Sequence, residues 1–204
     1  MPRQDEPIDP HDPRVIRTLS YYRDAEVRGA ALLLRLTLRL DDPTAQLNLA
    51  RHLADETRHA ALITERIVDL GAAPEIVSDG YQARMAQAGA VPRGIVDFYA
   101  ITLVAEERAR QRYVAHAKAA AVDTETRRLL RTLLKDETWH LAWVGQRLRE
   151  LAAVEGADRV AHAVRRFRAA DATVVAALDR SEREAFGFSL FVPSERQPSM
   201  ERSW

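Results

Sequence analysis

The order of hydrophobic and polar residues along the chain predicts a protein built from long amphipathic helices. Apolar residues recur every three or four positions, and the strict alternation that is typical of strands is hard to find. The first such stretch runs from about Asp12 to Leu40. A second follows the break "DDPT" (41–44), because Pro43 suits the first turn of a new helix, and it ends near Leu70.

The same pattern returns in the second half of the chain. A third helix is predicted from about Gly94 to Ala121, and the segment "VDTET" (122–126) makes a short turn after it. A fourth helix continues from this turn to about Val154. Gly156 then separates it from a fifth amphipathic helix over roughly 157–182.

The lengths of the connections predict how these helices are joined. Short turns make the first and second helices, and the third and fourth, antiparallel hairpins. Residues 71–93 form a link long enough to cross a helix of about 25 residues, which measures ~37 Å. We therefore expect an all-α fold: a four-helix bundle with one long crossover between its second and third helices, and a fifth C-terminal helix. The bundle with its fifth helix would span 14–183, between a flexible lead over 1–13 and an apolar strap with a mobile tail over 184–204.

Composition narrows the functional classes. Thirty acidic side chains balance thirty basic ones, which gives no support to nucleic acid or an anionic membrane surface as a partner. The sequence contains no cysteine, so disulfides, thiolate metal sites and rubredoxin-type iron centres are excluded. The opening "MPRQDEPIDPHDPR" is polar, and no apolar run is long enough to span a bilayer. We expect a cytoplasmic protein.

One acidic-histidine pentapeptide occurs twice, as "DETRH" ending at His59 and as "DETWH" ending at His140. Residues three positions apart share a helix face, so Glu56 points with the first histidine and Glu137 with the second. Apolar neighbours place both pairs beside buried faces, where a carboxylate needs a counter-charge or a metal ion. Each pair offers one oxygen and one nitrogen donor, which suits a divalent transition metal. A single copy would mean little, but two copies with the same flanking residues indicate a site.

Each hairpin also carries a glutamate in its first helix. The segments "AEVRG" and "AEERA" align so that Glu26 and Glu106 have the same helical phase, close to the apolar centre of their helices. Glu107 falls about 100° further round the helix and is the second choice. Gly29 and Ala109 have almost no side chain, which either leaves room for dioxygen or a substrate or serves close packing.

This set resembles the di-iron carboxylate proteins of the ferritin-like superfamily over residues of about 14–150. The resemblance implies a cofactor of two iron ions, and a Mn/Fe pair accepts the same ligands. It also implies the role of each residue: Glu26 and His59 are terminal ligands of one ion, Glu106 and His140 are terminal ligands of the other, and Glu56 with Glu137 bridges the two.

The residues around the ligands suggest a supporting network. A metal-bound imidazole usually donates its free N–H to a carboxylate or carbonyl. We predict that Asp55 and Asp136 each accept that bond from the histidine of the opposite motif; the alternative is that both are exposed helix charges. Arg58 completes the Asp-Glu-x-Arg-His pattern typical of di-iron oxygenases, from which the second copy departs with Trp139.

Other polar side chains are predicted to serve the core. Tyr22 and Tyr113 fall on the inner faces of their helices, where we expect packing, with a redox or proton role as the alternative. His52 lies one turn before Glu56 and is expected to be a core histidine. The alternative is that it supports a metal ligand by contacting it. His116 has no ligand partner at a useful spacing.

Three classes of function follow. The first is a di-iron or Mn/Fe oxygenase or oxidase that uses O2 to oxidise a small organic substrate. The second is iron oxidation, storage or peroxide removal, as in ferritins and rubrerythrins. The third is an interaction module with a structural metal. The fifth helix exceeds what a minimal storage bundle needs, and the lack of cysteine requires an external electron donor. We therefore expect the enzyme, as a monomer or homodimer.

Overall fold

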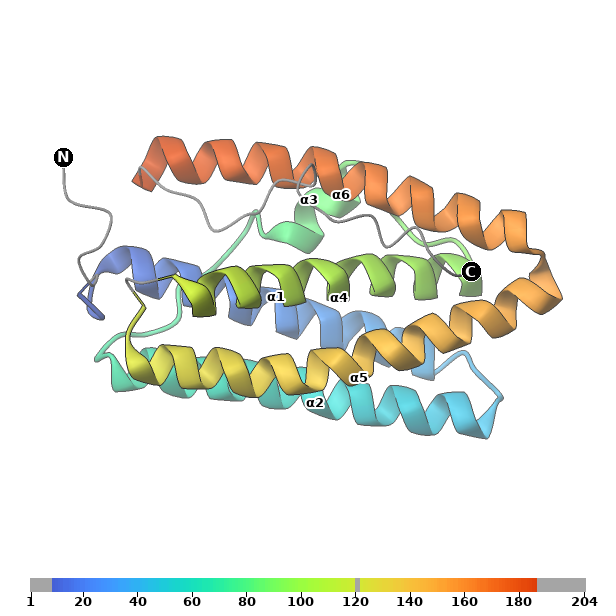
Figure 1. The fold of residues 1–204 in the computed structure, drawn as a ribbon, viewed down its shortest axis with the longest axis horizontal. Coiled ribbons are helices and arrows are strands. Elements are labelled where there is room, and N and C mark those ends of the chain that lie inside the picture. Colours follow the sequence, from blue (N-terminus) through green and yellow to red (C-terminus); the bar gives the residue numbers. More distant parts are fainter. Residues whose placement is uncertain (1–8, 120–121, 187–204) are drawn as a thin grey trace. The chain divides into compact units, whose positions relative to one another are not determined.

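Every element that the computed structural model contains in residues 9–119 and 122–186, the part of the chain it describes, is a helix. The all-α prediction is thus confirmed. The helices are α1 (Pro13–Thr37), α2 (Pro43–Asp69), α3 (Tyr81–Gln87), α4 (Ile95–Lys118), α5 (Thr124–Glu155) and α6 (Ala157–Phe186) (Figure 1). Within this part of the chain, we find no helix both long and apolar enough to cross a bilayer.

The structure corrects several predicted boundaries. α1 ends at Thr37 rather than near Leu40, and α6 continues to Phe186 rather than ending near residue 182. α5 begins inside the predicted turn, because the Asp123 carboxylate accepts a hydrogen bond from the backbone N–H of Thr126 at 2.9 Å and caps the helix there. The predicted third-helix end at Ala121, the first eight residues of the lead and the tail over 187–204 lie outside the described residues.

The long connection between α2 and α4 contains the short helix α3, which the sequence pattern did not predict. The stretch before α3 runs along α1. The hydroxyl oxygen of Ser20 accepts a bond from the backbone N–H of Glu75 at 2.9 Å, and the Tyr21 hydroxyl donates to Asp79 at 3.1 Å. The crossover is therefore fastened to the first helix.

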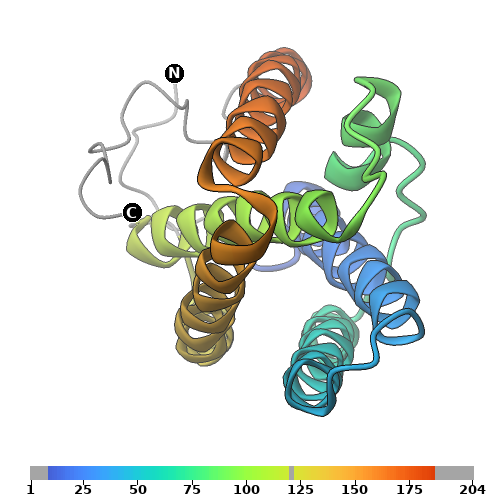
Figure 2. The ribbon, with the colours of Figure 1, turned by 90° about the vertical axis from the view of Figure 1, so that its right-hand side faces the viewer.

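The chain divides into two compact units, and each is described by itself. The first comprises residues 1–82 and 113–137. Its centre is the antiparallel hairpin of α1 and α2, which lie side by side in Figures 1 and 2. Apolar side chains recur at helical spacing along both helices, and six of them are almost completely buried: Leu19, Leu33, Leu36, Leu49, Ile63 and Ile67.

Both helices of this hairpin begin with the same N-cap arrangement. Asp12 and Asp42 are the N-caps, each accepting a bond from backbone N–H groups of the first turn, and a proline follows each cap. Such caps stabilise a helix by about 1 kcal/mol each. α2 ends before Gly71, whose φ of +72° closes the helix with a left-handed residue.

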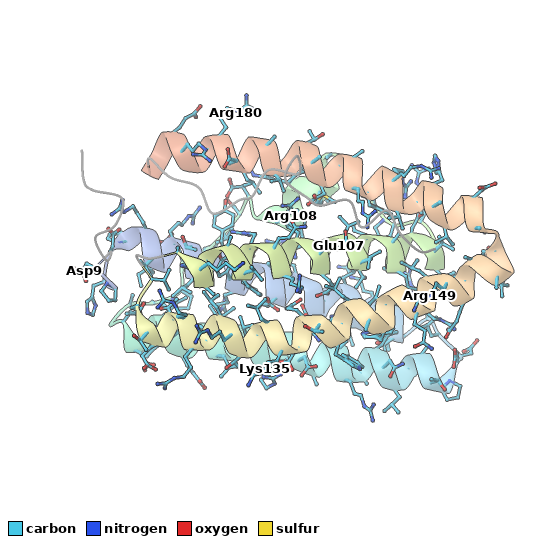
Figure 3. The ribbon with its side chains drawn as sticks, in the orientation of Figure 1. Asp9, Glu107, Arg108, Lys135, Arg149 and Arg180 are labelled. Atoms are coloured by element: carbon cyan, nitrogen blue, oxygen red, sulfur yellow. The ribbon has the colours of Figure 1, made fainter. Side chains whose placement is uncertain are left out.

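The second unit comprises residues 83–112 and 138–204, and its described part holds most of α4, the second half of α5 and α6. Gly156, with a φ of +95°, allows the turn from α5 into α6. α6 carries the fully buried Phe167 and is joined to α4 by ion pairs. The most buried of these joins Arg108 to Asp171, and Figure 3 labels Arg108 with its neighbour Glu107 on α4.

Candidate metal centre

Four of the six predicted ligands converge inside the first unit. Glu26 comes from α1, Glu56 and His59 from α2, and Glu137 from α5. Each side chain contributes an oxygen or nitrogen atom to a group whose members all lie within 4.8 Å of one another. All four residues are at most 5% exposed. The helical phases predicted for these residues therefore bring three carboxylates and one imidazole together in a buried place.

The charges of this group perturb its histidine. His59 Nδ1 lies 3.2 Å from a carboxylate oxygen of Glu26 and 3.8 Å from one of Glu137. Burial lowers the pKa of His59, but the hydrogen bond and charge of Glu26, helped by Asp136 and Glu56, outweigh burial and raise this pKa to about 9. Without a metal ion, the imidazole therefore carries a proton at neutral pH and supplies a positive charge among the carboxylates.

The second ring nitrogen of His59 is held from the opposite side. His59 Nε2 lies 3.1 Å from a carboxylate oxygen of Asp136, the contact that the sequence predicted for this aspartate. Arg58 donates to both Asp136 and Asp55 at 2.8 Å. Burial raises the pKa of Asp136, but its bonds to Arg58 and His59 lower it below the usual value. The imidazole is thus oriented with Nδ1 toward the carboxylates. The matching contact of Asp55 with His140 stays a prediction.

Glu56 occupies the space that Gly29 leaves open. A Cβ atom added to Gly29 would collide with a carboxylate oxygen of Glu56. The missing side chain therefore makes room for a candidate ligand at this position. His52 is also fully buried, and its Nε2 lies 3.3 Å from the other Glu56 oxygen. Its position one helical turn before Glu56 was the sequence signal for this contact.

A chain of aromatic side chains leads away from Glu26 within the same unit. The Tyr113 hydroxyl donates a hydrogen bond to Glu26. Burial, and then the negative charges of Glu26 and Glu137, raise the pKa of Tyr113 well above its usual value, so its phenol stays protonated. The rings of Tyr22 and Tyr113 meet edge to face with centroids 4.9 Å apart, and the Tyr22 hydroxyl lies 3.2 Å from Nδ1 of His116. Sequence reasoning missed His116, although it lies one turn after Tyr113.

The other two predicted ligands meet inside the second unit. His140 Nδ1 lies 3.4 Å from a carboxylate oxygen of Glu106, and these residues are 0% and 7% exposed. Glu107 instead forms an ion pair with Arg168 of α6 at 2.6 Å. The geometry thus separates the two candidate glutamates of α4: one lies beside a buried imidazole, and the other holds α6.

Trp139, which replaces the arginine of the first motif, packs edge-on against His140 with centroids 5.7 Å apart. The same indole lies 6.0 Å from the ring of Trp143, which contacts Tyr99 at 5.8 Å. In the second unit, an aromatic cluster therefore flanks the motif histidine.

The donor set fits a divalent transition metal. Carboxylate oxygens and imidazole nitrogens are the ligands that iron and manganese accept, and three buried carboxylates with one imidazole carry an excess of negative charge that a cation would balance. The raised pKa of His59 has the same origin, because in the metal-free protein a proton takes the place of that cation.

Comparison with known proteins supports this assignment. A family model described as a ferritin-like domain matches residues 44–154, which is more than half of the chain and includes both pentapeptides. Searches of the curated proteins and of the solved structures found no match. On the strength of the family model and the all-helical fold, the chain belongs to the ferritin-like family.

Proposed function

We propose that the protein is a non-haem di-iron oxidoreductase that uses O2 to oxidise or oxygenate a small organic substrate. The observation that carries this proposal is the buried group of Glu26, Glu56, His59 and Glu137, with donor atoms within 4.8 Å of one another. In a fold of this family, a bound cation is the simplest explanation for three carboxylates gathered away from water.

A second ion is proposed from the repeat in the sequence. Glu106 and His140 would be its terminal ligands, and Glu56 with Glu137 would bridge the two ions. Support comes from the burial of this second pair and from the ion pair that gives Glu107 another role. Four carboxylates and two divalent cations reach formal neutrality, so the set needs no protonated carboxyl. A Mn/Fe pair would satisfy the same ligands.

When bound, reduced iron supplies electrons and a Lewis acid for O2. The chain's own residues supply the surroundings. Tyr113 donates to Glu26 and fixes that carboxylate, and Asp136 holds Nε2 of His59 so that Nδ1 faces the carboxylates. Because the candidate ligands are buried in the core, water is kept away from the oxidant. In this proposal, electrons come from an external donor, because the sequence has no cysteine for an electron-transfer centre of the rubredoxin type.

One feature favours an enzyme over iron oxidation, storage or peroxide removal, which is the second candidate. α6 follows the four helices that carry the candidate ligands and is joined to α4 by a buried ion pair, so the chain has a helix beyond the minimal bundle. The two candidates differ in assembly: a storage protein needs a large hollow assembly, whereas the proposed enzyme is a monomer or homodimer that takes a small molecule.

The test combines size, metal content and turnover. Protein loaded anaerobically with Fe²⁺ is measured by sedimentation, by elemental analysis and by O2 uptake with and without a panel of small organic compounds, with Glu137→Gln as the disabled control. We expect a small oligomer and O2 uptake that is coupled to product formation. A large cage that mineralises iron would establish the storage candidate, and iron-free protein would contradict both.

A further inference from the structure

The first motif has a third buried donor, which the six predicted ligands do not include. His52 lies on α2 one turn before Glu56 and is 0% exposed. Together with Glu56 and His59 it occupies positions i, i+4 and i+7, which share one face of a helix. The face of α2 that carries the candidate ligands therefore presents two buried imidazoles and one buried carboxylate.

The second motif provides a comparison within the same chain. The residue four positions before Glu137 is Leu133, which is also 0% exposed. A leucine thus satisfies the packing at this position of the motif in α5. A buried imidazole is costlier, because its ring nitrogens lose their contact with water. Packing alone therefore does not account for the histidine in α2, and the contact of His52 with Glu56 points to a polar role.

The distance between His52 and Glu56 matches that of two ligands of one ion. His52 Nε2 lies 3.3 Å from Oε1 of Glu56. Bonds of about 2.1 Å from a metal ion to nitrogen and oxygen place neighbouring donor atoms about 3.0–3.4 Å apart. A charge-assisted hydrogen bond would be shorter, at about 2.7–2.9 Å. The spacing therefore suits shared coordination of a cation better than a charged hydrogen bond.

Glu56 presents its two oxygens to different neighbours. Oε2 fills the space beside Gly29, and Oε1 faces His52. A carboxylate arranged in this way can bind one ion through each oxygen, which is the bridging role proposed above for Glu56. His52 then lies beside the oxygen that would hold one of the two ions.

We propose that His52 is a seventh protein ligand, which binds through Nε2 the same ion as Oε1 of Glu56. The neutral imidazole adds a donor without adding charge, so four carboxylates still balance two divalent cations. The two ions become unequal, because one of them gains a nitrogen ligand and has one position fewer for a small molecule. This inference rests on the proposed function, since the two ions are the ones proposed there.

The added nitrogen also bears on which metal is bound. Imidazole suits iron, whereas manganese is better served by carboxylate oxygens. His52 therefore favours iron over manganese at its own ion and has no such effect at the other. In a mixed Mn/Fe pair, the ion beside His52 would be the iron.

The experiment counts metal-bound imidazoles one by one. Wild-type protein is loaded with Co²⁺, its metal content is measured, and proton NMR spectra are recorded in H2O and D2O. Each metal-bound imidazole keeps one exchangeable N–H, whose signal the paramagnetic ion displaces far outside the ordinary range. We expect three such signals, from His52, His59 and His140. His52→Leu, which copies the residue of the second motif, should lose one signal and bind one Co²⁺ more than about 10-fold more weakly.

The matched control is His116→Gln, which removes another buried imidazole of the same unit that contacts Tyr22 instead. It should keep all three signals and both Co²⁺ ions. Wild-type protein that binds two Co²⁺ ions with only two signals would overturn the seventh ligand and leave the proposed function intact, because His52 would then act only through Glu56. Three signals that persist in His52→Leu would overturn it too. Failure of the wild type to bind metal would overturn both.

A competition experiment tests the metal preference. Wild type and His52→Leu are loaded anaerobically from equal concentrations of Fe²⁺ and Mn²⁺, and the bound metals are measured by elemental analysis. We expect the bound fraction of manganese to rise in His52→Leu. An unchanged fraction would show that His52 does not select the metal.

Discussion

The two motif histidines stand in the same pentapeptide frame but in different surroundings. In the first unit, charged groups surround His59: carboxylates lie on one side of its ring, and Asp136, itself bound by Arg58, lies on the other. In the second unit, His140 has Glu106 beside Nδ1 and the indole of Trp139 against its ring. The repeat thus preserves the donor atoms, while the neighbours that orient them differ.

The same contrast appears in the ion pairs around each motif. Arg58 bridges Asp55 and Asp136 with its side chain 43% exposed, so solvent screens these contacts. Next to Glu106, Arg108 pairs with Asp171 by two hydrogen bonds in a buried place. The first network orients a candidate ligand, whereas the second secures a helix. Ion pairs near the candidate ligands therefore have two separate roles, orienting a ligand and holding a helix. Substitutions should distinguish these roles by their effects on metal affinity and on the free energy of unfolding.

The largest expected effect concerns the helix-securing pair. Asp171→Asn leaves the Arg108 guanidinium buried without its counter-charge, which should lower the free energy of unfolding by about 3–5 kcal/mol. Urea titration followed by circular dichroism measures this. Glu107→Gln breaks the more exposed pair with Arg168 on the same two helices and should cost only about 0–1 kcal/mol. Equal losses in the two variants would refute the distinction.

The pH dependence of the metal-free protein should follow His59. Its pKa of about 9 in the folded state exceeds the ordinary value of 6.5, so protonation stabilises the fold. This contribution is fully present below pH 6.5 and disappears as the pH rises through about 9, which corresponds to about 3 kcal/mol. Urea midpoints with a chelator present should therefore fall over that interval. His59→Gln should remove this component; an unchanged profile would show that another group is responsible.

A smaller effect is expected where Asp136 holds the imidazole. Asp136→Asn weakens the bond to His59 Nε2 and the contact with Arg58, and should reduce the affinity for Fe²⁺ or Co²⁺ by about 10–100-fold. Titration calorimetry with Co²⁺ would measure this loss. Asp55→Asn tests in the same way the prediction that Asp55 supports His140. If Asp136→Asn binds Co²⁺ as tightly as the wild type, the orienting role is wrong.

The smallest effect belongs to Arg58 itself. Arg58→Ala removes two solvent-screened ion pairs and should change the free energy of unfolding by less than about 1 kcal/mol. Its effect on Co²⁺ affinity should also be smaller than that of Asp136→Asn, because the aspartate still faces the imidazole. If Arg58→Ala lowered the free energy of unfolding as much as Asp171→Asn, the proposed difference between the two ion-pair networks would be wrong.

Sequence reasoning reached the parts of the molecule that local periodicity determines. The long helices follow from apolar spacing, and Glu26 could be placed because its phase on α1 is fixed by the residues around it. The convergence of Glu56, His59 and Glu137 likewise follows from two amphipathic helices facing one core. The ferritin-like fold was predictable for this reason.

Other features depend on contacts between distant segments and left no local signal. The role of Glu107 becomes visible only when α6 brings Arg168 beside it, and the space next to Gly29 is filled by a side chain from another helix. The pairing of Tyr22 with His116 joins residues 94 positions apart. The seven-residue α3 is too short for its apolar period to be recognised.

The central claim is that the buried glutamates and histidines bind a pair of metal ions, and metal stoichiometry tests it most directly. Protein prepared anaerobically with excess Fe²⁺ and freed of loose metal should retain two iron ions per chain, and their Mössbauer spectrum should show carboxylate and nitrogen ligation. Glu137→Gln should lose both ions, whereas Glu107→Gln should keep them. If wild-type protein retains no iron, or if Glu137→Gln retains as much as the wild type, the account is contradicted.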